Sequence, residues 1–112
     1  MLKCIDNSLY TGITNNIKER ILTHYYKKPG CAKYTRSHQV TGIAAVWTAN
    51  EKSDALRLEK FIKSLPRNKK IDLSENQESL SELVGDKFDS SYFHPYKILF
   101  EEIINEQSKQ NS

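Results

Sequence analysis

Three side chains near the N-terminus are of types that act on phosphate esters. Tyr10 opens the run Tyr10-Thr11-Gly12, and Arg20 and His24 follow it, four residues apart. Residues at this spacing lie on one face of a helix, on successive turns. A phenol, a guanidinium and an imidazole can orient water, grip an anion and move a proton, so the pattern favours a phosphate site. The alternatives are a packing tyrosine and a solvent-facing pair of arginine and histidine.

Local patterns predict the elements that would position these groups. Apolar and β-branched residues predict strands over 1–5, 8–13 and 40–48, the first two joined as a hairpin. Apolar residues at helical spacing predict helices over 14–27, 50–65, 77–84 and 97–106. Three short strands and four or five helices place the chain in the α+β class.

Turn formers and prolines mark where these elements begin and end. Thr14, Asn15 or Asn16 can cap the first helix, and Pro66 ends the second. Pro29-Gly30 and Gly85 end the first and third helices. No element is predicted in the polar stretches, namely residues 31–39, the basic cluster 67–70 and the loop 86–96.

Composition narrows the class of protein. The 112 residues suffice for one compact domain. Cys4 and Cys31 lack a metal-binding spacing, and His24, His38 and His94 are too scattered for a zinc site, so we expect reduced thiols in a cytoplasmic protein. No stretch approaches the ~20 apolar residues of a membrane span, and the N-terminus lacks the apolar run of a secretory signal.

Charge is distributed unevenly along the chain. Residues 1–70 hold 14 Lys and Arg against 5 Asp and Glu, a balance of +9, and residues 71–112 hold 3 against 9, a balance of −6. A basic body favours a polyanionic partner, although a solvated lysine-rich surface is the alternative. The acidic tail complements the body, which predicts that it packs against or shields the basic face.

Four landmarks together resemble the GIY-YIG nuclease superfamily, over residues 1 to about 83. The second half of the family's signature motif is matched by Tyr10-Thr11-Gly12. The arginine and the histidine of the family's helix match Arg20 and His24. The Ala-Lys-Tyr-Thr run of its small bacterial members stands at residues 32–35. The helix of its metal-binding glutamate matches Ala55, Leu56, Glu59 and Lys63.

The resemblance implies a fold and an activity. The fold is a small three-stranded antiparallel sheet flanked by helices, with residues 1–84 as the nuclease domain and 85–112 as an acidic loop and extra helix. The activity is metal-dependent endonuclease cleavage of DNA in repair or recombination, with structural rather than sequence preference and no small-molecule cofactor. Homodimerisation stays open.

The resemblance also implies roles for single residues. Glu59 would hold Mg²⁺ or Mn²⁺, Arg20 would grip the scissile phosphate, and Tyr10 would orient or deprotonate the attacking water. His24 would position water, stabilise the leaving group or bond to Tyr10. Without the pattern, Glu59 would be read as an ion-pair partner of Lys63. The first signature tyrosine falls just ahead of Met1, so an inactive nucleic-acid-binding module or a protein-interaction domain are the alternative functions.

Basic residues interleaved with tyrosines suit contacts to a DNA backbone and to bases. No helix carries Asn, Gln and Arg at the spacing that reads base edges, which favours recognition of shape. The residues predicted to bind nucleic acid are Gly12, Lys27, Lys28, Lys33, Tyr34, Arg36, Lys63, Arg67, Lys69 and Lys70.

Overall fold

The computed structural model describes residues 1–84 and 89–110, which form two compact units. The sheet unit comprises residues 2–10, 14–43 and 98–110. The helical unit comprises Met1 and residues 11–13, 44–84 and 89–97. Strands and helices occur in both units, so the predicted α+β class is confirmed.

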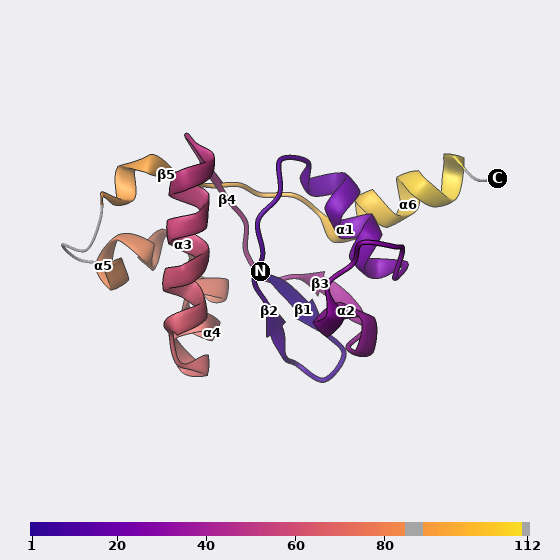
Figure 1. The fold of residues 1–112 in the computed structure, drawn as a ribbon, viewed down its shortest axis with the longest axis horizontal. Coiled ribbons are helices and arrows are strands. Elements are labelled where there is room, and N and C mark those ends of the chain that lie inside the picture. Colours follow the sequence, from indigo (N-terminus) through magenta and orange to yellow (C-terminus); the bar gives the residue numbers. More distant parts are fainter. Residues whose placement is uncertain (85–88, 111–112) are drawn as a thin grey trace. The chain divides into compact units, whose positions relative to one another are not determined.

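A three-stranded antiparallel sheet is the centre of the sheet unit (Figure 1). Its middle strand β1 (Leu2–Cys4) pairs with β2 (Leu9–Tyr10) and with β3 (Val40–Ile43). The predicted hairpin of the first two strands is confirmed, although β2 is shorter than the predicted 8–13. Asn7 takes a left-handed φ of 65° in the turn, a conformation that asparagine tolerates.

Three helices pack with this sheet: α1 (Ile17–Tyr25), α2 (Lys33–Ser37) and α6 (Phe100–Gln110). Asn16, one of the three predicted caps, accepts a hydrogen bond from the Glu19 backbone N–H and so starts α1. The predicted C-terminal helix is confirmed as α6. Its Ile103 is buried in the same apolar cluster as residues from the strands and α1, namely Leu2, Cys4, Ile21 and Val40.

The predicted strand 40–48 is wrong as one element. It divides into β3 of the sheet unit and β4 (Trp47–Ala49) of the helical unit. β4 pairs antiparallel with β5 (Phe93–Pro95), which lies in a predicted loop. A continuous apolar run shows where a strand can form but not which partner its backbone will find. Pro95 stands at the end of β5, where its missing N–H is tolerated.

The helical unit is built on α3 (Lys52–Ser64), which confirms the predicted helix 50–65 within two residues at its start and one at its end. Leu58, Phe61 and Ile62 are its buried apolar residues. A second helix, α4 (Arg67–Glu75), begins directly after Pro66. It includes the basic cluster 67–70, for which no helix or strand was predicted. Pro66 stops α3 because proline lacks a backbone N–H and disfavours a helical conformation in the residue before it, and it then stands as the N-cap of α4.

Short elements complete this unit. The predicted helix 77–84 is confirmed as the 3-10 turn η1 (Gln77–Ser79) followed by α5 (Leu80–Val84). A second 3-10 turn, η2 (Ser90–Tyr92), leads into β5. The predicted stop at Gly85 and residues 86–88 of the predicted loop lie outside the described residues. Within the described ranges, no helix has the length and apolar character needed to cross a bilayer.

Candidate active site

Tyr10, His24 and Tyr34 form an aromatic cluster within the sheet unit. The Tyr10 ring centroid lies 5.1 Å from that of His24, with the planes tilted by 59°, and 6.1 Å from that of Tyr34, nearly parallel at 16°. The three residues come from β2, α1 and α2 respectively. Tyr10 is therefore in contact with one of its predicted catalytic neighbours and with a residue predicted to bind nucleic acid.

His24 faces the interior of the sheet unit. It follows Ile17 and Ile21 at helical spacing, so it lies on the apolar face of α1, and only 2% of the residue is exposed. Its Nδ1 lies 2.7 Å from the hydroxyl oxygen of Thr35. Burial, assisted by the nearby Arg20 guanidinium, lowers the pKa of His24 to about 4. The imidazole is thus neutral at pH 7, so the solvent-facing alternative is wrong for this residue.

Arg20 lies one helical turn before His24 and is half-buried. Its guanidinium donates a hydrogen bond to the Gly30 carbonyl oxygen at 2.8 Å. Gly30 has a φ of +92°, a conformation that favours glycine, so the loop after α1 brings this carbonyl within reach. A guanidinium has five N–H donors, so one bond to the backbone orients Arg20 without exhausting its capacity to bind an anion.

His38 and Asp6, neither of them predicted as a site residue, support Tyr34. The His38 ring stacks on Tyr34 at 3.9 Å between centroids and 1° between planes. His38 Nδ1 lies 2.9 Å from the Tyr34 carbonyl oxygen, and its Nε2 lies 3.7 Å from the Asp6 carboxylate. The signal in the sequence was the four-residue spacing of Tyr34 and His38, which has meaning only once residues 33–37 are known to be helical.

Glu59, the predicted metal ligand, lies on α3 of the helical unit. Its side chain is 21% exposed and forms an ion pair with Lys63 at 3.7 Å. The ion pair that would explain Glu59 without a metal is therefore present. Among residues 1–84 and 89–110, no group of three or more His, Cys, Asp or Glu side chains could hold a metal ion.

A single carboxylate is nevertheless compatible with magnesium. Mg²⁺ commonly keeps several waters and binds through one or two carboxylates together with substrate phosphates. Glu59 offers hard oxygen donors from a thirteen-residue helix and keeps part of its surface in solvent. The side chain thus fits the predicted metal in type and accessibility, with Lys63 as the competing cation.

The predicted site residues are divided between the units. Tyr10, Arg20 and His24 lie in the sheet unit, and Glu59 lies in the helical unit. The predicted nucleic-acid-binding residues of the sheet unit are Lys27, Lys28, Lys33, Tyr34 and Arg36, and those of the helical unit are Gly12, Lys63, Arg67, Lys69 and Lys70. Tyr34 and Lys70 are half-buried and the others are exposed.

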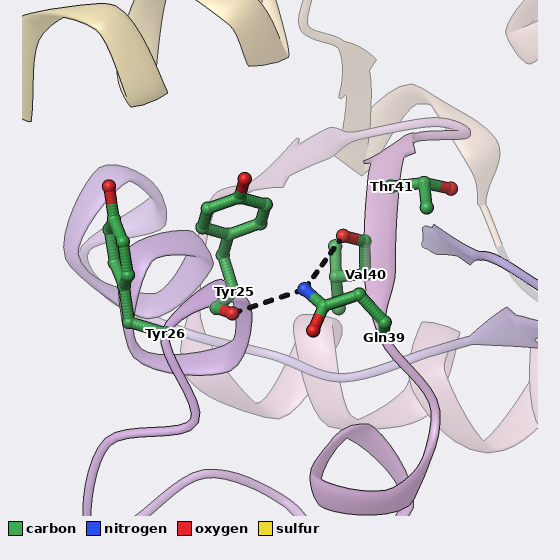
Figure 2. Close-up of a pocket in the computed structure, with 5 residues that line it drawn as sticks. All are labelled: Tyr25, Tyr26, Gln39, Val40 and Thr41. Atoms are coloured by element: carbon green, nitrogen blue, oxygen red, sulfur yellow. Dashed lines mark hydrogen bonds between the residues drawn. The ribbon is translucent and has the colours of Figure 1, made fainter. Parts of the chain in front are cut away.

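A surface pocket of about 540 Å³ also belongs to the sheet unit (Figure 2). Its lining residues are Tyr25, Tyr26, Gln39, Val40 and Thr41, none of them a member of the aromatic cluster. The Gln39 amide donates to the carbonyl oxygens of Tyr25 and Val40, each at 3.2 Å. The Lys28 ammonium lies 5.8 Å from the Tyr26 ring centroid, so a cation and an aromatic ring meet beside this pocket.

Comparison with known proteins identifies the family to which this chain is similar. The model of the GIY-YIG catalytic domain matches residues 1–72. UPF0213 protein OB0043 of Oceanobacillus iheyensis is 44% identical over 78 residues, covering 70% of this chain and 88% of its own. UPF0213 protein DP2720 of Desulfotalea psychrophila is 35% identical over 98 residues, covering 88% and 82%. No solved structure matches the chain.

The matched model spans more than half of the chain, and the relatives are matched over most of their length. The chain therefore belongs to the GIY-YIG family, and the predicted resemblance is confirmed. It is a nuclease-type domain, and members of this family are generally endonucleases that use a divalent metal ion. UPF0213 protein YazA of Bacillus subtilis, 33% identical over 84 residues, is a further relative.

Proposed function

We propose that this chain is a metal-dependent endonuclease that hydrolyses DNA phosphodiester bonds and selects its substrate by structure. The observation that carries the proposal is the buried, neutral His24 against the Tyr10 ring. A neutral imidazole keeps one ring nitrogen whose lone pair can accept a proton from a phenol, whereas an imidazolium has no such nitrogen. Membership of the GIY-YIG family supports the reaction class.

Each predicted catalytic residue has a role that its own surroundings support. Arg20, oriented by the Gly30 carbonyl, binds a non-bridging phosphate oxygen through its planar donors. Tyr10 orients the attacking water, and His24 accepts a proton from the phenol or from that water. Glu59 of the helical unit would hold Mg²⁺ or Mn²⁺, which would supply positive charge to a phosphate oxygen.

Binding to DNA is proposed to use the exposed cations of both units. Lys27, Lys28, Lys33 and Arg36 provide positive charge in the sheet unit, and Lys63, Arg67 and Lys69 provide it in the helical unit. Contacts to phosphates hold DNA without reading its sequence, which supports recognition of shape. We place this function in the predicted nuclease domain, residues 1–84, with residues 85–112 as the acidic appendage.

The test is cleavage of flap, branched and single-stranded DNA by the full chain in Mn²⁺. Glu59→Ala should abolish cleavage while leaving DNA binding in EDTA within about 2-fold, because the carboxylate acts through the metal. Glu75→Ala is the matched control, since it removes an exposed carboxylate from α4 of the same unit. Cleavage that survives Glu59→Ala, or DNA binding without cleavage by the unmodified chain, would contradict the proposal.

A further inference from the structure

The Ala32–Thr35 run contains a buried hydroxyl that the proposed reaction has not used. Thr35 lies on α2 and is completely buried, at 0% exposure. Its side chain takes part in two contacts within the sheet unit. One joins its hydroxyl oxygen to the Ala32 carbonyl oxygen at 3.0 Å, and the other joins it to His24 Nδ1 at 2.7 Å.

Proton counting decides how these two contacts can coexist. A carbonyl oxygen only accepts, so both contacts are hydrogen bonds together only when the hydroxyl donates its single proton to Ala32. The hydroxyl oxygen is then an acceptor toward His24, and the hydrogen between them belongs to Nδ1. If Nδ1 instead carried the lone pair, the hydroxyl would donate to Nδ1 and its bond to Ala32 would be lost. The Ala32 carbonyl oxygen also accepts from the Arg36 backbone N–H at 3.0 Å, so the cost would be that of one hydrogen bond, about 0.5–1.5 kcal/mol.

We propose that Thr35 is a positioning residue that holds His24 in the Nδ1–H tautomer and thereby reserves Nε2 as the proton acceptor. This deepens, and rests on, the proposed nuclease function. The Nε2 lone pair is what His24 needs to take a proton from the Tyr10 phenol or from water. The low pKa of His24 supports this role, because a tautomer is defined only while the ring is neutral.

The first experiment measures the tautomer directly on the full chain. Long-range ¹H–¹⁵N NMR at pH 7 distinguishes a protonated Nδ1 from a protonated Nε2 by their nitrogen shifts. The unmodified chain should show His24 protonated on Nδ1. A ring protonated on Nε2 would overturn the proposal, and this measurement needs neither DNA nor metal.

Substitutions then separate the hydroxyl from the shape of the side chain. Thr35→Val removes the hydroxyl at nearly constant volume and should shift His24 toward the Nε2–H tautomer. Thr35→Ser keeps the hydroxyl and should restore Nδ1–H. Thr23→Val is the matched control, because the Thr23 hydroxyl bonds to the Glu19 carbonyl, at 2.9 Å, rather than to His24, and this variant should leave the tautomer unchanged.

Cleavage assays add the functional readout. Thr35→Val should lower kcat about 10-fold with little change in KM, and Thr35→Ser should recover most of it, as for residues that orient a reacting ligand. Thr35→Ala serves in place of Thr35→Val if the valine variant does not fold. An unchanged tautomer in the hydroxyl-free variant would overturn the inference, whereas absence of cleavage in every variant, with the tautomer shift as expected, would overturn only the nuclease function.

Discussion

The two units of this chain hold their candidate functional groups in different ways. In the sheet unit, the Tyr10 ring contacts both His24 and Tyr34, and His24 is buried and neutral. In the helical unit, Glu59 keeps a fifth of its side chain exposed and is paired with a mostly exposed lysine. The comparison teaches that the proposed proton acceptor lies where burial lowers its pKa, and that the proposed metal ligand lies where water can still reach it.

The largest effect is expected from the oriented guanidinium. Arg20→Ala should lower the cleavage rate about 10³-fold, since it removes charge stabilisation aimed at the phosphate. Arg20→Lys should recover only a small part, because an ammonium lacks the planar pair of donors. Steady-state cleavage measures both variants. A rate within 10-fold of the unmodified chain for Arg20→Ala would assign Arg20 to the Gly30 loop alone.

Disturbing the apolar core beside the aromatic cluster should have the next largest effect, which is a loss of folding stability. Ile21 is 1% exposed in the core of the sheet unit, so Ile21→Ala should lower the free energy of unfolding by about 3 kcal/mol. Leu73→Ala, at 0% exposure on α4, gives the same measurement for the helical unit. Urea denaturation reports both. A cost below 1 kcal/mol at Ile21 would mean that this core is not packed as described.

The positive charges of the two units can be compared by their effect on DNA affinity. Neutralising Lys27, Lys28 and Lys33 together to glutamine should weaken binding about 10-fold at low salt and reduce the slope of log affinity against log salt. The matched triple in the helical unit replaces the exposed Lys63, Arg67 and Lys69. Titration of labelled DNA at several salt concentrations measures both, and an unaffected triple would exclude its unit from the DNA-binding surface.

The pH dependence of stability should separate the two units through their histidines. Because the folded pKa of His24 is about 4, below the ordinary value of 6.5, the unfolded chain binds more protons between these values. The His24 contribution is therefore fully present above pH 6.5 and is lost as the pH falls toward 4. His24→Gln should flatten the fall in Tm over that window, whereas His94→Gln, at an exposed position on β5, should leave it unchanged.

The smallest effect is expected from the support of Tyr34. His38→Ala removes a stacked ring at 3.9 Å and should cost about 1 kcal/mol of stability. Lys63→Gln, which removes the ion pair to Glu59, should cost about 0.3 kcal/mol. Thermal unfolding and the ring proton shifts of Tyr34 measure the first change. Unshifted Tyr34 resonances in His38→Ala would show that the stack does not hold the ring.

The acidic tail is more than a charged appendage. Ile103 of α6 lies in the core of the sheet unit, and Lys18 of α1 pairs with Glu106 at 3.9 Å. Deleting the tail would therefore remove core packing together with its charge. Glu101 and Glu102 are exposed, so changing both to glutamine isolates the predicted shielding of the basic face, which should appear as a modest gain in DNA affinity at low salt.

Local sequence was enough to predict α1, α3, α6 and the N-terminal hairpin. Asn16 caps α1 because its side chain reaches an N–H three residues on, and Pro66 ends α3 because it cannot continue the helix. The types and order of Tyr10, Arg20, His24 and Glu59 indicated the family before any contact was known. These features depend on groups within a few residues of one another.

Only the tertiary structure decided the features that join distant residues. Thr48 of β4 lies opposite His94 of β5, and the Thr35 hydroxyl meets His24 from a different helix. Neither contact can be predicted from the local sequence pattern. A strand can pair with the edge of any other suitable strand, and the pKa of a histidine depends on the residues that bury it. The sequence by itself determined which chemical groups are present, and folding determined which of them lost their water and acquired a partner.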